Sequence, residues 1–481
     1  MNLIQDQTRR HFISDCFLGL GGLALSSVLG QHVLSPSGPT QNSSAQVIGP
    51  HYKPAVKNVI YIHMAGAPSH LELFDYKPEL EKLNGQECPP SLLEGKRFAF
   101  IRGVPKMLGP QGKFKQHGDS GAWISNYLPY LSNVADDLTF LKGVYTDQFN
   151  HAPAQLLMHT GSARLGRPSM GSWVTYGLGS ENENLPGFVV LTSGGNNPDA
   201  GKSVWGSGFL PSLYQGVQCR SDGDPVLFID NPDYINRKER RASIDAINEI
   251  NNLTYSEYQD PEIKTRIAQY ELAYKMQITV PEVMDISREP EYIHNLYGSD
   301  ANQSLFANNV LLARKLVEQG VRFVQLFDWG WDTHGTSPDG SIDIGLWNKC
   351  KQSDQAVSAL IVDLKQRGLL DETLVIWGGE FGRTPMQENR EGKTNPFLGR
   401  DHHAEAFTMW MAGGGLKKGF SFGETDEIGY SVTQGKVSTY DIQATILHLL
   451  GFDHEKLVYP YQGRDFRLTD VHGSLIKDVL A

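Results

Sequence analysis

The chain has few cysteines, no excess of basic residues and no long apolar run. Four of its 481 residues are cysteines, and Cys88, Cys219 and Cys350 are those beyond the N-terminal segment. Three thiols allow at most one disulfide, which excludes a disulfide-stapled scaffold. The net charge of −11 argues against a general nucleic-acid binder, whose affinity depends on Lys and Arg. No segment reaches the roughly 20 apolar residues that a stable membrane span needs.

The N-terminus carries the pattern of a twin-arginine export signal. Arg9 and Arg10 precede a short, glycine-rich apolar segment at 17–29, and a polar stretch follows. A chance Arg-Arg pair before a buried helix is the alternative. The twin-arginine machinery exports folded proteins, so we expect a periplasmic or secreted protein. The predicted parts are a signal segment over 1–35, a disordered linker over 36–54 and a folded domain over 55–481.

Amphipathic helices alternate with apolar strands in the second half of the chain. A helix predicted over 304–319 is followed by a strand over 321–327, and a helix over 347–366 by a strand over 373–377. This alternation predicts a mostly parallel sheet with helices on both faces. Residues 234–300 are charged and helix-periodic, which predicts a helical insertion or cap. Further strands are predicted at 58–63, 188–191 and 406–412, a loop that opens a helix at 151–161, and a further helix at 440–450.

Acidic and histidine residues follow the predicted strands at their carboxyl ends. They are Asp332, His334, Glu380, His402 and His403. Because ligands of parallel sheets bind beyond the carboxyl ends of the strands, we expect these side chains to converge on one divalent cation. An acid that follows a buried strand is costly unless a metal or an arginine opposes its charge.

The ligand types limit the choice of metal without fixing it. Carboxylates together with imidazoles fit zinc, manganese or iron, whereas calcium favours a set richer in oxygen. The identity therefore stays open, with calcium among the candidates. Each residue also has a simpler interpretation. Asp332 could cap a helix, and Glu380 could pair with Arg383 or Arg400.

The motifs WDTH, GGEFGRTP and GRDHH resemble a secreted bacterial family catalogued as domain of unknown function number fifteen-oh-one. The resemblance runs from about residue 58 to the C-terminus, and the family is placed in the alkaline phosphatase and sulfatase superfamily. It implies an alkaline-phosphatase-like, or sulfatase-like, three-layer α/β sandwich with divalent metal at the strand ends. It also implies Asp332 and His334 as an Asp…His pair, Glu380 as the strand-end acid, and His402 or His403 as the later histidine.

The segment HAPAQLLMHTG, from His151 to Gly161, resembles the helix start that carries the sulfatase nucleophile. Sulfatases have C-x-P-S-R there, whereas this chain has His151 at the cysteine position and Gln155 at the arginine position. The superfamily's first metal-binding Asp is also missing, because Ala65 and Gly66 stand where it is expected. For His151 three roles stay open: a nucleophile, a metal ligand or general acid–base, and a residue that only orders the loop.

Together these features predict an exported, metal-dependent hydrolase of sulfate or phosphate esters. Its substrate would be a small anionic ester or a sulfated polysaccharide, with His151 facing the reacting group and Arg383 and Arg400 clamping the anion. The alternative is a non-catalytic, sulfatase-like metal-binding or assembly protein of the cell envelope. The replaced cysteine and the missing Asp favour this alternative, while the acids and histidines at the strand ends favour the enzyme.

Overall fold

The computed structural model describes residues 48–481 apart from 221–224, 227–230, 233 and 391. The predicted signal segment and most of the predicted linker therefore lie outside the described residues. The end of that linker packs on the folded body, because Gly49 N donates to Gly177 O (2.9 Å) and His51 N to Gly451 O (2.8 Å). None of the helices in the described part is both long and apolar enough to cross a membrane.

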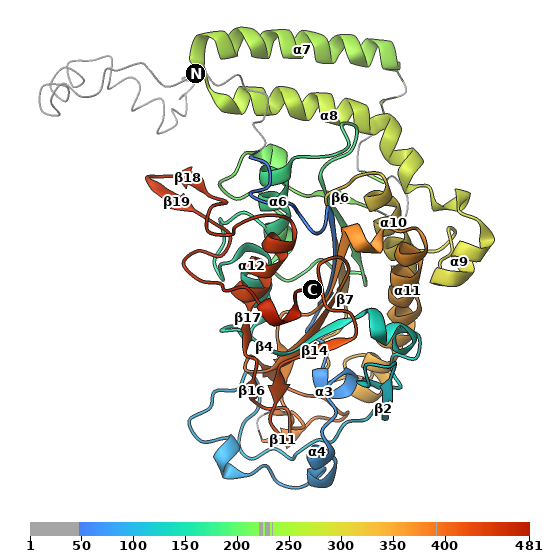
Figure 1. Cartoon of the computed structure of the whole chain (residues 1–481), viewed down its shortest axis with the longest axis vertical. Helices are drawn as coiled ribbons and strands as arrows, with labels where there is room; N and C mark the ends of the chain where they lie inside the picture. The colour runs from blue at the N-terminus through green and yellow to red at the C-terminus, as the bar shows by residue number, and fades with distance from the viewer. Residues whose placement is uncertain (1–47, 221–224, 227–230, 233, 391) are drawn as a thin grey trace, which may run out of the picture. The chain divides into compact units, whose positions relative to one another are not determined.

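A nine-stranded sheet lies at the centre of the molecule (Figure 1). Its strand order is β14-β4-β13-β8-β1-β7-β5-β6, and β17 pairs with β4. Neighbouring strands run parallel except where β13 pairs with β4 and β8. The strands are β1 (Asn58–Ala65), β4 (Thr139–Tyr145), β5 (Phe188–Ser193), β6 (Val217–Cys219), β7 (Phe323–Trp329), β8 (Thr373–Gly378), β13 (Phe407–Ala412), β14 (Phe420–Phe422) and β17 (Val437–Ser438).

Helices cover both faces of this sheet, and the alternation of side chains along β1 shows how. Ile60 and Ile62 point into one apolar core with residues of α10 and α11, whereas Val59 and Tyr61 point into a second core with residues of α5, α6 and α12. A strand buried on both faces is mostly apolar, as β1 is apart from Asn58 and His63. The helices are α5 (His151–Thr160), α6 (Met170–Leu178), α10 (Phe306–Glu318), α11 (Trp347–Gln366) and α12 (Thr439–Leu449). The predicted three-layer α/β class is confirmed.

The charged segment 234–300 is mostly helical. Its two long helices, α7 (Arg237–Tyr258) and α8 (Pro261–Met284), pack on each other, and α8 also contacts α10 (Figure 1). Asn236 and Glu239 form a capping box at the start of α7, which satisfies backbone N–H groups that a helix start leaves unpaired. α9 (Glu291–Tyr297) follows in the same segment.

Short elements make up most of the loops around the sheet. The short helices are α3 (His70–Leu73) and α4 (Pro78–Leu83). The short strands are β2 (Phe114–His117), β3 (Ala122–Ser125), β9 (Gly382–Arg383), β10 (Asn389–Arg390), β11 (Lys393–Thr394), β12 (His402–His403), β15 (Glu424–Thr425), β16 (Val432–Gln434), β18 (Tyr459–Tyr461) and β19 (Arg464–Phe466). The pair of β9 and β12 matters most for function, because it joins the loop that follows β8 to the histidines of β12.

Candidate metal site

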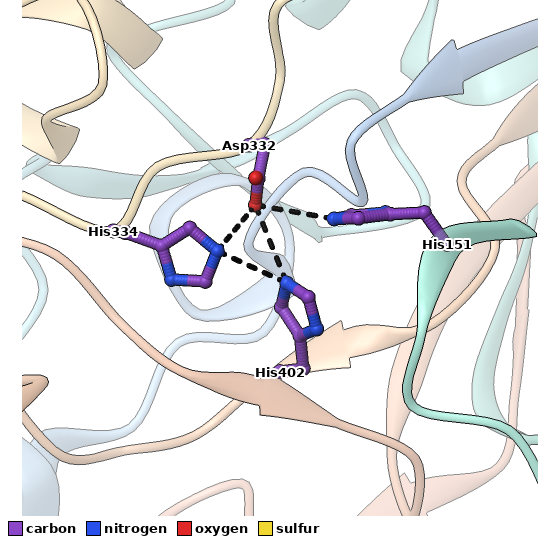
Figure 2. A group of neighbouring side chains, drawn as sticks. All are labelled: His151, Asp332, His334 and His402. Atoms are coloured by element: carbon purple, nitrogen blue, oxygen red, sulfur yellow. Dashed lines mark hydrogen bonds and ion pairs between the residues drawn. The ribbon is translucent and has the colours of Figure 1, made fainter. Parts of the chain in front are cut away.

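Four side chains converge beyond the carboxyl end of β7. Asp332 and His334 lie in the loop after this strand, His402 lies on β12, and His151 is the first residue of α5. Figure 2 shows the carboxylate and the three imidazole rings turned toward one another. One ligand atom from each residue lies within 4.8 Å of all the others, so the group could hold a metal ion.

The inner atoms of this group are a carboxylate oxygen and three Nε2 atoms. Asp332 Oδ1 lies 2.8 Å from His334 Nε2 and 3.4 Å from the Nε2 atoms of both His151 and His402. The two ring nitrogens of His334 and His402 are 3.0 Å apart. Ligands of a tetrahedral zinc ion at about 2.05 Å are spaced by about 3.3 Å, so the group has the right dimensions for one small cation.

The outer nitrogen of each ring is held by an acceptor, which explains why the three Nε2 atoms face inward. His402 Nδ1 donates to the carbonyl oxygen of Phe149 (2.7 Å), and His151 Nδ1 lies 2.6 Å from Glu380 Oε1. The Nδ1 atom of His334 contacts a carboxylate oxygen of Glu388. A ring whose single proton is held on Nδ1 presents a lone pair on Nε2, which is the form that binds metal.

The surroundings of His151 and His402 shift the pKa values of these two imidazoles in opposite directions. Burial alone lowers the pKa of His151, but its hydrogen bonds and charge interactions with Asp332 and Glu380 raise it to about 9. Burial, reinforced by the neighbouring charge of Arg383, lowers the pKa of His402 to about 3 despite its contact with Asp332. In the metal-free protein a proton on His151 therefore supplies part of the positive charge that a cation would bring.

Arg383 opposes the charge of Asp332 and contacts the same carboxylate oxygen as the histidines. Its guanidinium is fully buried, contacts Asp332 Oδ1 and donates to the carbonyl oxygens of Ala67 (3.0 Å), Arg400 (3.1 Å) and Gly66. This pairing, together with the histidines, holds the pKa of Asp332 far below its usual range although burial acts the other way. Arg383 thus lies beside the site, and its donors are engaged by the protein itself.

Glu380 does not reach the converging atoms itself, because the ring of His151 lies between them. It is fully buried, and its Oε1 accepts from Gln155 Nε2 (3.0 Å) and Gly66 N (3.1 Å) in addition to its contact with His151. Burial raises the pKa of Glu380, yet the hydrogen bonds and charges of His151 and His63 keep it well below its ordinary value. The structure therefore places this predicted ligand behind His151, where it orients the ring.

Two further predicted site residues, His403 and Arg400, lie outside the group. His403 follows His402 on β12, and its Nε2 donates to the carbonyl oxygen of Tyr430. Arg400 is fully buried and forms an ion pair with Glu72, with Nη2 2.7 Å and Nε 2.9 Å from Oε1. Neither side chain is brought to the converging Nε2 atoms.

Two glycines allow the loops to approach closely enough. Gly66 has φ +113°, and a Cβ there would lie 2.5 Å from the backbone nitrogen of Asp332. At Gly399 a Cβ would lie 1.9 Å from the carbonyl carbon of His334. Side chains at these positions would push the loop that carries Asp332 and His334 out of place.

Sequence reasoning missed Glu388, which fixes the ring of His334. Glu388 is fully buried and is also held by Arg390 Nε (2.6 Å) and Asn395 Nδ2 (3.2 Å). Together with His334 and Asp401 it forms a second group of metal-ligand type. Asp401, however, accepts from backbone N–H groups, so this group shapes the loop around the first one. The position of Glu388 in the loop after Glu380 was the one feature of the sequence that could have indicated it.

The comparison with protein families gives a match over nearly the whole folded part. The family described as "Protein of unknown function (DUF1501)" matches residues 56–480. This confirms the family that the WDTH and GGEFGRTP motifs indicated. The curated proteins gave no match.

Solved structures of similar fold share little sequence with this chain. A sulfatase from Pseudoalteromonas sp., PsFucS1, is 13% identical with a TM-score of 0.38, covering 89% of this chain and 72% of that one. The lipoteichoic acid synthase LtaP from Listeria monocytogenes is 10% identical (TM-score 0.36; 89% and 78% covered). Alkaline phosphatase from the Antarctic bacterium TAB5 is 12% identical (TM-score 0.32; 76% and 94% covered). Likenesses at this level assign no activity to the chain.

Proposed function

This chain belongs to the DUF1501 family, and from that premise we propose that it is an exported, metal-dependent hydrolase of sulfate or phosphate esters. One observation carries the proposal: three Nε2 atoms and a carboxylate oxygen meet at the carboxyl end of the sheet, at the spacing of ligands around one ion. Three imidazole lone pairs that face one carboxylate repel it unless a cation or protons lie between them.

Asp332, His334 and His402 would hold the ion. Two imidazoles and one carboxylate are the composition of several catalytic zinc sites. A bound divalent cation polarises an ester oxygen and lowers the pKa of water, which is the chemistry that hydrolysis at neutral pH requires. Zinc, manganese, iron and calcium remain the candidate metals.

His151 would act on the reacting group through its Nε2 atom. Glu380 holds the Nδ1 proton, so Nε2 is the atom at which this ring can accept a proton and return it to a leaving group. His151 is also the first residue of α5, and the positive end of a helix dipole favours a negatively charged ester beside it. We assign no anion clamp to Arg383 or Arg400, because the protein engages their donors.

A metal-binding protein without catalysis is the second candidate, and one observation favours it. With His151 included, the site offers four ligand atoms from the protein, which is the number that closes a structural zinc site. In that case no position would be left for water or an ester.

Export by the twin-arginine machinery is part of the proposal and is supported by Arg9, Arg10 and the apolar segment at 17–29. A reporter enzyme fused behind residues 1–35 should reach the periplasm of a suitable host. Replacing both arginines by lysine should keep the reporter in the cytoplasm, and unchanged export would contradict this route.

The activity is tested on protein stripped of metal and reloaded with Zn²⁺, Mn²⁺ or Ca²⁺. Elemental analysis should give one ion per chain, and aryl sulfate or aryl phosphate should be hydrolysed. Asp332→Asn should lose the ion, His151→Ala should lose turnover, and the neighbouring His403→Gln should serve as the matched control. An ion without turnover on either ester supports the second candidate. A folded chain that takes up no ion contradicts both.

A further inference from the structure

A row of buried polar side chains leads from Glu380 into the core. His63 lies on β1, His159 on α5 and Gln325 on β7, and each is at most 1% exposed. The ring of Phe327 lies 5.3 Å from that of His63 and 5.2 Å from that of His159, so the surroundings are apolar. None of these three polar residues has a part in the proposed hydrolysis, although burying them is costly.

Short contacts link these residues one after another. Gln325 Nε2 lies 2.9 Å from His159 Nδ1, and His159 Nε2 lies 3.1 Å from His63 Nδ1. His63 Nε2 then lies 3.2 Å from Glu380 Oε2. These last two atoms are buried and have no hydrogen-bond partner elsewhere, so each is the polar group that faces the other.

The chemistry of the end groups gives the row one direction. A carboxylate only accepts, so His63 must carry its proton on Nε2 to face Glu380. When Nε2 carries the only ring proton of His63, its Nδ1 atom accepts from His159 Nε2–H, and His159 Nδ1 accepts from the amide of Gln325. Burial lowers the pKa of His159 well below its usual value, which agrees with a neutral ring. A reversed row would set a lone pair of His63 against the carboxylate.

We propose that Gln325, His159 and His63 are positioning residues for the metal site. Their one-way row supplies a donor to Glu380 Oε2, so the carboxylate stays ionised and fixed. Its Oε1 then holds the proton of His151 on Nδ1 and leaves Nε2 directed at the converging ligand atoms. This inference deepens the proposed function and rests on it for its metal readout, whereas its tautomer readout needs no metal.

The tautomers are read from ¹⁵N chemical shifts of the ring nitrogens in metal-free protein labelled at histidine. Protonated and unprotonated ring nitrogens resonate far apart, and single His→Gln variants assign the signals. His63 and His159 should both carry their proton on Nε2 alone. A proton on Nδ1 of either ring overturns the proposal, whether or not the chain binds metal. Failure of the metal site alone leaves this result unaffected.

Two pairs of variants distinguish the effect of the hydrogen-bonding groups of Gln325 and His63 from the effect of their packing. Gln325→Glu keeps the shape but replaces the donor by an acceptor, whereas Gln325→Met removes the polar group and allows the direction to persist. His63→Gln keeps an acceptor and a donor, whereas His63→Met leaves a buried oxygen of Glu380 without a donor. Zn²⁺ affinity should fall by about tenfold to a hundredfold in Gln325→Glu and His63→Met, the range for residues behind metal ligands.

The order of the variants decides the outcome. Gln325→Met and His63→Gln should bind Zn²⁺ more tightly than their partners, with circular dichroism confirming that all four are folded. A role in packing alone predicts that near-isosteric Gln325→Glu is the milder change at its position. Equal affinities within each pair, or Gln325→Glu tighter than Gln325→Met, overturn the proposal. If the wild-type chain binds no Zn²⁺, the proposed function fails and the tautomers decide alone.

Discussion

Zinc binding at this site should be opposed by a proton on His151. In the metal-free protein the pKa of His151 is raised to about 9, because its contacts with Asp332 and Glu380 outweigh the effect of burial. The Nε2 atom must give up this proton before it can face a cation. Because the pKa lies above neutrality, the proton is bound at pH 7 and is released on metal binding. The affinity for Zn²⁺ should therefore rise with pH.

The size of this effect follows from the distance between the pH and the pKa. At pH 7 the ring is about two units below its pKa, so the Zn²⁺ dissociation constant should be about a hundredfold larger than above pH 9. This equals about 2.7 kcal/mol, at about 1.36 kcal/mol for each unit. Between pH 6.5 and 8.5 the logarithm of the association constant should gain about one per pH unit.

The assay is a competition with a chromophoric chelator whose own protonation is known, at fixed ionic strength. Calorimetry in buffers of different ionisation enthalpy then counts the protons released, and about one is expected at pH 7.5. His151→Gln should flatten the profile, whereas His472→Gln, at an exposed histidine, should follow the wild type. A wild-type profile with the same slope as that of His151→Gln would refute the reasoning.

Three further predictions follow from the same contacts. Because the folded pKa of His151 lies above its unfolded value of about 6.5, the metal-free chain should lose about 3 kcal/mol of stability as the pH rises from 6.5 to 9, measured by urea unfolding. Arg400→Met should lower the free energy of unfolding by about 3–5 kcal/mol, because it leaves Glu72 buried and unpaired, and the folded fraction should keep its metal. Gly66→Ala should cost about 1–3 kcal/mol of backbone strain and, by displacing Asp332, should weaken Zn²⁺ binding in calorimetry.

Periodicity was sufficient to predict the layers of the fold. The helix predicted over 347–366 has the same bounds as α11, because its apolar positions recur at helical spacing and Gly368 follows its end. The direction of β13 could not be predicted. Its residues Phe407–Ala412 are buried along the whole strand, and an apolar strand reads the same whether it runs with or against its neighbours.

The converging residues were only partly predictable, because the sequence does not show in which direction each side chain points. The sequence offered His402 and His403 as alternatives, but adjacent strand residues point to opposite faces, and only the fold shows that His402 faces Asp332. Arg400 was visible in the sequence as the arginine of the GRDHH motif. Its partner Glu72 is 328 residues away along the chain, and a motif read locally does not reveal such a pairing.

The exposure of the four side chains indicates which one a substrate would meet. His402 and His334 are 3% and 8% exposed, whereas His151 and Asp332 are 13% and 28% exposed. The open side of the site is therefore the side of His151 and Asp332, and the proposed ester would approach from there. If His151 serves as a fourth ligand, it closes the one accessible side, and the protein binds metal without turnover. If the contact with Glu380 instead keeps His151 off the metal, so that the ring acts as a base, that side stays open to the ester. The placement of one imidazole thus separates the enzyme from the binding protein.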